Sequence, residues 1–241
     1  MPVYLIVNLA AVFIPAALTF HPSIRHQRAW RVFTPAILLP ALFYIGWDIV
    51  FTSWGVWGFN ETYLIGAGLF GLPLEEILFF FLIPYAYLFS YEGLRRLPIL
   101  RKLNTIAGHV FTLLAFVLLG VALINYQRVY TFTAFLVTAL LILFLISWKK
   151  PDYRGPLLAN YLIIYAFPFL IVNGALTGAG LENPVVWYNN LENLGLRIIT
   201  IPVEDFFYGL GLMVANIAIY EHLLGAETKK GRRYGPIIQN S

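Results

Sequence analysis

Seven stretches of the chain are apolar over roughly 20 residues, the length that a helix needs to cross a bilayer. They lie at 3–20, 33–51, 73–92, 106–124, 129–147, 157–175 and 203–223. Hydrophobic residues make up 60% of the 241 residues and charged residues only 12%. A soluble domain would carry about twice that share of charge. The pattern therefore predicts an all-α integral membrane protein with seven transmembrane helices.

Positive charge is confined to alternate connections between these stretches. All of the 16 Lys and Arg residues except Arg128 and Arg197 lie in the connections and tail at 21–32, 92–105, 148–156 and 224–241. Because cytoplasmic loops carry the excess of Lys and Arg, the N-terminus is expected outside and the C-terminus in the cytoplasm. The basic residues serve as topology signals and partners of lipid phosphates. No single face concentrates them, so a nucleic-acid partner is not expected.

A polar motif occurs twice, at an offset of 129 residues. Pro73-Leu74-Glu75-Glu76 matches Pro202-Val203-Glu204-Asp205, and Phe59-Asn60 matches Tyr188-Asn189 at the same offset without a gap. Agreement over about 70 residues at one offset indicates an internal repeat. Helices 1–3 are therefore expected to repeat as helices 5–7, with helix 4 as a connector.

This repeat divides the chain into a first three-helix unit at 1–105, a connecting helix at 106–128, a second unit at 129–225 and a basic cytoplasmic tail at 226–241. A three-helix unit ends on the opposite side of the membrane from its start, so a second copy in the same orientation needs one extra crossing. The resulting 3+1+3 arrangement predicts parallel repeats, related by an axis along the membrane normal. Both acidic motifs then lie at the outer ends of helices 3 and 7 and can converge on that axis.

Two adjacent carboxyl groups open each of these two helices. Proline followed by an acid in the first turn is also an ordinary helix start. Acids at the edge of hydrocarbon are costly and usually functional. Three further features favour a functional site: the motif recurs, like charges are paired, and aromatic residues follow. The candidate catalytic residues are Glu75, Glu76, Glu204 and Asp205. Adjacent helical positions point about 100° apart, so only one member of each pair can face a shared cavity fully.

Such acids fit proton transfer in an apolar cavity. Burial and a neighbouring carboxylate both favour the protonated form of a carboxyl group. A protonated acid there can donate to a carbon–carbon double bond, its ionised neighbour can take a proton back, and aromatic faces can stabilise a transient cation. The ordinary role of such aromatic residues is packing and lipid contact, and that of Asp48 and Asn173 is capping. The candidate substrate-binding residues are Phe79, Phe80, Phe207, Tyr208, Asp48 and Asn173.

The loops before the two acidic helices, 52–72 and 176–202, are long and rich in aromatic residues, among them Trp57 and Tyr188. Aromatic residues at this depth are usually interfacial anchors. The alternative is that they roof a cavity.

The doubled Pro-x-Glu-Glu/Asp motif, the 3+1+3 helices and the basic inner loops closely resemble the membrane-embedded carotenoid lycopene cyclases in their fused single-chain form. The resemblance covers nearly all of the chain. It implies that lycopene ends are converted to β-rings, giving γ-carotene and β-carotene, by protonation of the terminal double bond, ring closure and loss of a proton. No net redox change is involved. It also implies a carotenoid substrate in the bilayer of a prokaryotic cytoplasmic membrane, with lipid and other carotenoid-pathway enzymes as partners.

Other functions fit the helices less well. A small-molecule transporter with parallel three-helix repeats is the alternative, but transporters place polar groups near the midplane, where helices 3 and 7 are largely apolar. A retinal photoreceptor needs a lysine within a helix, and every lysine here lies in an inner loop or the tail. The dinucleotide-like pattern at 66–71 follows no strand of a βαβ unit, so no cofactor is expected. The isolated His109 and His222 predict no metal site.

Overall fold

The computed structural model describes residues 1–19, 30–147 and 151–229, and these residues are mainly helical. The helices are α1 (Val3–Thr19), α3 (Trp30–Ser53), α4 (Leu74–Leu94), α5 (Pro98–Arg101), α6 (Asn104–Ile124), α7 (Val129–Ser147), α8 (Arg154–Ala166), α9 (Pro168–Leu176) and α10 (Val203–Lys229), with short 3-10 helices η1 (Glu61–Tyr63) and η2 (Pro151–Tyr153). The strands are β1 (Trp57–Phe59), β2 (Gly68–Leu69), β3 (Leu72–Pro73), β4 (Val186–Tyr188), β5 (Arg197–Ile198) and β6 (Ile201–Pro202). Most of the basic loop at 21–32 and of the tail lies outside the described residues.

Five of the described helices are long and apolar enough to cross a membrane, namely α3, α4, α6, α7 and α10. Helices α8 and α9 together would make a sixth span, but they meet at an angle of 48°. The break falls at Pro168, whose ring disfavours a helical conformation in the preceding residue, and Phe167 is indeed non-helical (φ −138°, ψ −69°). The seventh apolar segment, α1, has only 17 residues. A helical membrane protein is thereby confirmed, while the count of seven spans stays a prediction.

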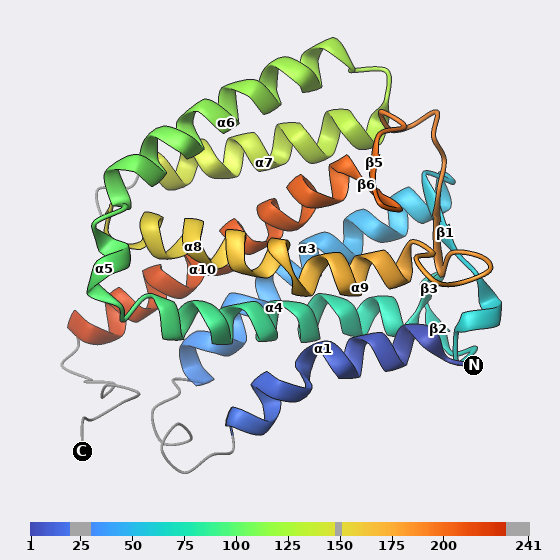
Figure 1. Ribbon diagram of the computed structural model, residues 1–241, viewed down its shortest axis with the longest axis horizontal. Coiled ribbons are helices and arrows are strands. Elements are labelled where there is room, and N and C mark those ends of the chain that lie inside the picture. The colour runs from blue at the N-terminus through green and yellow to red at the C-terminus, as the bar shows by residue number, and fades with distance from the viewer. Residues whose placement is uncertain (20–29, 148–150, 230–241) are drawn as a thin grey trace.

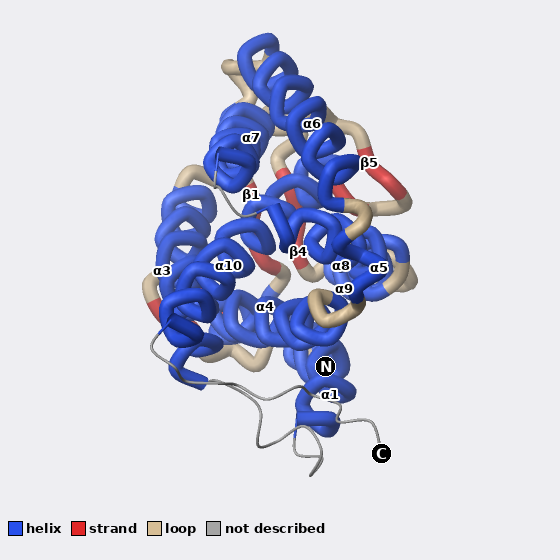
Figure 2. The backbone as a smooth tube through the Cα atoms, turned by 90° about the vertical axis from the view of Figure 1, so that its left-hand side faces the viewer, coloured by secondary structure: helices blue, strands red, loops and turns tan. Residues whose placement is uncertain are grey.

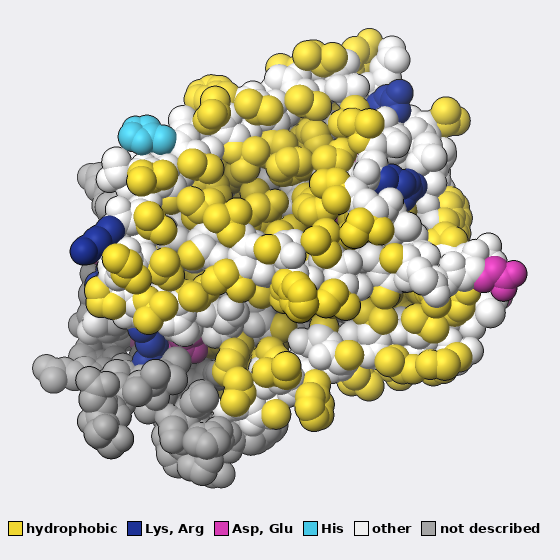
Figure 3. All heavy atoms as spheres, in the orientation of Figure 1, with side chains coloured by type: hydrophobic (Ala, Val, Ile, Leu, Met, Phe, Trp, Pro, Cys, Tyr) yellow, Lys and Arg dark blue, Asp and Glu magenta, His cyan; other side chains and the backbone are white. Residues whose placement is uncertain are grey.

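The helix axes are roughly aligned, and the short strands gather at one end of the bundle together with the N-terminus (Figure 1). Helix α5 and the end of α10 lie at the opposite end. Hydrophobic side chains cover the middle of the face shown in Figure 3, and the visible charged side chains lie toward its edges. Large apolar residues such as Phe43 on α3 and Leu113 on α6 are exposed. A surface of this kind suits contact with lipid.

Helices α4 and α10, which carry the two acidic motifs, lie inside the bundle (Figure 2). Helix α1 packs on α4 and α7 packs on α10, while α3 and α8 each contact both. A buried polar pair joins α4 to α10, because Tyr87 donates from its hydroxyl to Asn216 Oδ1. Asn216 Nδ2 donates in turn to the Ala36 carbonyl of α3 at 2.6 Å, and Asn160 Nδ2 of α8 donates to the Tyr87 carbonyl at 3.2 Å. These bonds fix four helices to one another in the apolar interior.

Strands β1 and β4 pair antiparallel where the two long loops meet. Gly58 lies opposite Trp187, its counterpart at the 129-residue offset. The flanking hydrogen bonds are reciprocal: Asn60 N–H donates to the Val185 carbonyl and Asn189 N–H to the Val56 carbonyl, both at 2.9 Å. Equivalent residues that exchange contacts in this way are the mark of a two-fold arrangement. Gly58 permits the close crossing, since a Cβ there would lie 2.3 Å from the Trp187 ring.

The segment with the dinucleotide-like glycine pattern forms a small hairpin before α4. Strand β2 pairs with β3, and β5 pairs with β6 in the same way before α10. Phe70 and Ile199 both adopt a positive φ, at 55° and 60°, in equivalent turns of these hairpins. Within the described residues all sheets are two-stranded, so this pattern is not part of a βαβ unit.

Candidate active site

The first acid of each motif turns toward the loop that precedes its helix. The Ile65 N–H donates to Glu75 Oε1 at 2.7 Å, and the Leu194 N–H donates to Glu204 Oε1 at the same distance. Thr131 of α7 also donates to Glu204 Oε1, at 2.6 Å. Both carboxyl groups are 0% exposed and neither lines the cavity described next. These two predicted residues therefore anchor backbone in the structure.

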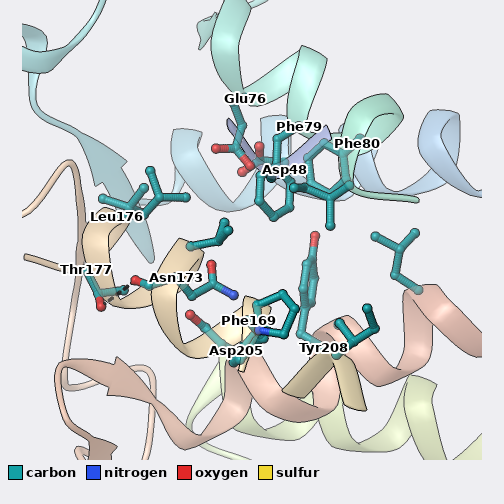
Figure 4. A pocket seen from close by; sticks show the side chains of 18 of the residues that line it. Asp48, Glu76, Phe79, Phe80, Phe169, Asn173, Leu176, Thr177, Asp205 and Tyr208 are labelled. Carbon is teal, nitrogen blue, oxygen red and sulfur yellow. Dashed lines mark hydrogen bonds between the residues drawn. The ribbon is translucent and has the colours of Figure 1, made fainter. Parts of the chain in front are cut away.

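The second acid of each motif faces a cavity of about 150 Å³. Glu76 comes from α4 and Asp205 from α10, and both line it. Asp48 of α3 joins them as a third carboxyl group on the wall. Figure 4 shows Glu76 and Asp48 on one side of the cavity and Asp205 with Tyr208 on the other. One member of each acidic pair thus faces a shared cavity, as the helical geometry of adjacent residues requires.

The first acidic centre consists of two carboxyl groups in direct contact. Glu76 and Asp48 interact with each other, and Glu76 Oε2 also accepts a hydrogen bond from the Tyr4 hydroxyl of α1. Asp48 Oδ1 accepts from Trp57 Nε1 and, at 3.4 Å, from the Thr52 hydroxyl. Asp48 Oδ2 is buried and receives no donor from the described residues. A proton held between the two carboxyl groups would give that oxygen a partner.

The second acidic centre holds one carboxyl group between two tyrosines. Tyr130 of α7 donates to Asp205 Oδ1 at 2.5 Å, and Tyr188 of β4 donates to Asp205 Oδ2 at 2.8 Å. Burial and the neighbouring Asp205 carboxyl raise the pKa of Tyr188 well above its ordinary value, so its hydroxyl keeps its proton. The Arg197 guanidinium lies 5.6 Å from the centre of the Tyr188 ring. Two O–H donors and a nearby cation are arranged to stabilise a carboxylate.

Aromatic rings form much of the wall between the two centres. Tyr208 and Trp57 both line the cavity, and their rings meet edge to face with centroids 6.1 Å apart. Tyr44 and Trp47 are not part of the lining, and their rings pack edge to face on Tyr208 with centroids 4.8 and 5.2 Å away. The Tyr208 hydroxyl is buried and accepts or donates no hydrogen bond among the described residues. Aromatic faces around an apolar cavity can stabilise a transient cation by their quadrupoles.

All but one of the predicted substrate-binding residues line the cavity. Phe79, Phe80, Asn173 and Tyr208 line the cavity together with Asp48. Phe207 does not, since it lies next to Tyr208 on another face of α10 and packs on Phe135 of α7, with ring centroids 5.1 Å apart. The structure therefore places Phe207 at a helix contact, away from the cavity.

Sequence reasoning missed two of the tyrosines that donate to the acids, Tyr4 and Tyr130. Tyr4 and Tyr130 each occupy the second position of an apolar helix, but they are 126 residues apart, so the 129-residue offset did not pair them. Of the loop aromatics, Trp57 and Tyr188 do line the cavity, whereas Trp54 is 64% exposed. Trp57 and Tyr188 therefore cover the cavity, which was the alternative to interfacial anchoring for these loop residues.

Comparison with known protein families shows which family has a matching sequence. A family model described as lycopene cyclase matches residues 1–94 and 127–223. The chain belongs to the lycopene cyclase family. Each matched region contains one acidic motif, and the stretch between them contains α6, in keeping with a fused lycopene cyclase. Comparisons with curated proteins and with solved structures gave no match. Membership in the lycopene cyclase family supports lycopene cyclase activity and a carotenoid substrate.

Proposed function

We propose that this protein converts the acyclic end groups of lycopene to β-rings, giving γ-carotene and then β-carotene, by proton-initiated cyclisation. The observation that carries the proposal is that Glu76 and Asp205, which occupy the same position of the two acidic motifs, line one cavity with aromatic walls. Burying a carboxyl group in hydrocarbon costs free energy. A shared role in one reaction explains why two helices each place such a group at the same cavity.

The proposed reaction needs an acid and a base and nothing else. A carboxyl proton forms a new C–H bond at the terminal double bond, which leaves a cation on the neighbouring carbon. The electrons of a second double bond then form the ring C–C bond, and loss of a proton from the ring restores a double bond. Substrate and product are isomers, so no oxidant or reductant is consumed. Each proton transfer by a positioned group contributes typically 10²–10⁴-fold to the rate.

The cavity is proposed to take one end group at a time. Its lining residues lie toward the end of α4 and α10 where the acidic motifs are, and the polar groups among them include Glu76 and Asp205. The remaining polyene is then free to lie along the apolar bundle and the surrounding lipid. Asp48 and Asn173 are proposed to orient the reacting groups, and Phe79, Phe80 and Tyr208 to contact the end group and its cation.

The membrane arrangement belongs to the same proposal. We place seven spans in the bilayer as two parallel three-helix units at 1–105 and 129–225, joined by the helix within 106–128 and followed by a basic tail at 226–241. The contacts that recur at 129 residues support this arrangement, among them those of Glu75 and Glu204. The basic connections put the N-terminus outside and the C-terminus in the cytoplasm. The membrane is proposed to be the cytoplasmic membrane of a prokaryote.

Expression in a lycopene-accumulating host tests the function. The wild-type chain is expected to convert lycopene to β-carotene, and Glu76→Gln and Asp205→Asn are each expected to lower conversion about 10²-fold or more. Glu92→Gln is the matched control: Glu92 is also a buried acid of α4, but it pairs with Arg96 at 2.8 Å and lies about 24 Å further along the helix. Unchanged lycopene with the wild-type protein verified in the membrane would refute the proposal.

A further inference from the structure

We infer that the two acidic centres have different tasks: the Asp48–Glu76 pair supplies the proton that starts cyclisation, and Asp205, held by Tyr130 and Tyr188, accepts the proton that ends it. This assignment rests on the proposed function. It adds Asp48 to Glu76 as part of the proton donor, and it gives the two halves of the repeated chain different chemical roles.

Asp48 has no acidic counterpart in the second half of the chain. The residue at the 129-residue offset is Thr177, whose hydroxyl donates to the Asn173 carbonyl at 2.7 Å and pairs with the Thr200 hydroxyl. Asp48 is 1% exposed, and its Oδ2 receives no N–H or O–H from the described residues. A second carboxyl group in contact with Glu76 is therefore a feature of the first centre alone.

Two carboxyl groups in contact hold a proton between them, because both cannot be ionised at that separation without strong repulsion. The hydrogen bonds from Trp57 to Asp48 Oδ1 and from Tyr4 to Glu76 Oε2 orient the pair. The titratable groups that act on the pair from surrounding elements are Tyr4 of α1, Tyr188 of β4, and Asp205 and Tyr208 of α10. The Tyr4 hydroxyl stabilises a charge on Glu76, whereas burial, Asp48 and the Asp205 carboxyl group oppose a second negative charge on the pair. The pair therefore holds a proton that it can donate.

Asp205 is in the opposite situation. Both of its oxygens accept hydrogen bonds from phenol O–H groups, and no second carboxyl group touches its side chain in the described structure. Arg197 lies beyond the Tyr188 ring and adds a positive charge on that side. Burial disfavours a charge on Asp205, and the donors to both oxygens together with Arg197 offset that cost. They favour the carboxylate, the form that can accept a proton from the ring. The proton balance closes when the accepted proton returns to the pair or leaves to solvent.

A pH profile of lycopene conversion in membranes tests the role of Asp48. Asp48→Asn replaces the second carboxyl group by an amide N–H donor, so the pair no longer holds a proton and the alkaline limb of the profile moves to lower pH. Trp57→Phe removes the donor that stabilises the ionised pair, so the same limb moves to higher pH. Asp48→Glu keeps a carboxyl group and is expected to keep the wild-type limb, even where its maximal conversion falls.

Product analysis tests the role of Asp205. Asp205→Asn is expected to lower conversion and to yield rings with the double bond in other positions, because another base removes the final proton from a different carbon. Asp48→Asn is expected to lower conversion without changing the ring type. Wild-type turnover in the same assay distinguishes the proposed function from the assignment of donor and acceptor. An inactive wild type would refute the proposed function and not only the assignment.

Three results would overturn the assignment while leaving the function intact. The first is an active Asp48→Asn variant whose alkaline limb coincides with that of the wild type. The second is a shift of the limb in the same direction for Asp48→Asn and Trp57→Phe. The third is an Asp205→Asn variant that makes only the wild-type ring. If Asp48→Asn fails to accumulate in the membrane, the direction of the Trp57→Phe shift decides the matter.

Discussion

The two acidic helices are alike at the first acid of their motifs and different at the second. Glu75 and Glu204 accept from the backbone N–H ten residues earlier, each at 2.7 Å. Glu76 instead meets Asp48 and Tyr4, whereas Asp205 meets Tyr130 and Tyr188. The contact that fixes the loop is thus repeated, and the surroundings of the carboxyl group that faces the cavity are not. This difference is where we place the division between proton donor and proton acceptor.

The largest effect should come from removing the phenol donors of the second centre. The double variant Tyr130→Phe/Tyr188→Phe leaves the buried Asp205 carboxylate without either hydrogen bond, and each bond to a charged group is worth about 1.5–3 kcal/mol. We expect the initial rate of lycopene loss to fall roughly 10²-fold or more. Tyr4→Phe removes one donor from Glu76 and should cost only about tenfold. Equal losses would mean that the two centres depend on their tyrosines in the same way.

A smaller effect, on stability, should follow at the first acids. Glu75→Ala and Glu204→Ala each leave a loop N–H without its acceptor, which costs about 1–3 kcal/mol. Glu75→Gln and Glu204→Gln keep an acceptor oxygen and should cost less. Heating the detergent-solubilised protein and measuring the fraction that remains monodisperse checks both pairs. A Glu75→Gln variant that is as stable as the wild type but as inactive as Glu76→Gln would show that Glu75 takes part in the chemistry.

The crossing of β1 and β4 offers a test of how the two halves are joined. Gly58→Ala would place a Cβ 2.3 Å from the Trp187 ring, and we expect a loss of about 1–3 kcal/mol from overpacking. The same heating assay measures it. Adding Trp187→Ala should restore most of the lost stability, because it removes the atoms that the new methyl group meets. No recovery in the double variant would place the damage elsewhere.

The smallest expected effect is at Thr131, which donates to Glu204 at 2.6 Å. In the first half, Asn8 of α1 donates to the backbone carbonyl of Glu75 at 2.8 Å and not to its side chain. Thr131→Val should therefore cost about 1 kcal/mol, the value of a single hydrogen bond, with little change in lycopene conversion. A loss of activity comparable to that of Asp205→Asn would contradict the anchoring role of Glu204.

Apolar periodicity and the doubled motif predict the helices and the acids of the motif, but not the contacts among side chains within the site. Apolar length predicted every long helix, and the 129-residue offset paired Glu76 with Asp205, because both signals can be read directly along the sequence. The contact of Asp48 with Glu76 joins α3 to α4 across the bundle, and no spacing along the chain encodes it. Phe207 and Tyr208 looked alike as neighbours in sequence. Only the packing of α10 against α7 decides that Tyr208 faces the cavity and Phe207 does not.

The most direct test of the central claim is the mass of the product formed in heavy water under single-turnover conditions. Protein in membranes equilibrated with D₂O, in excess over lycopene, is expected to give β-rings that each carry one deuterium, since the proton comes from an exchangeable carboxyl group. Glu76→Gln should give almost no labelled ring, and Glu92→Gln should match the wild type. Cyclic product without deuterium would contradict cyclisation by a carboxyl proton.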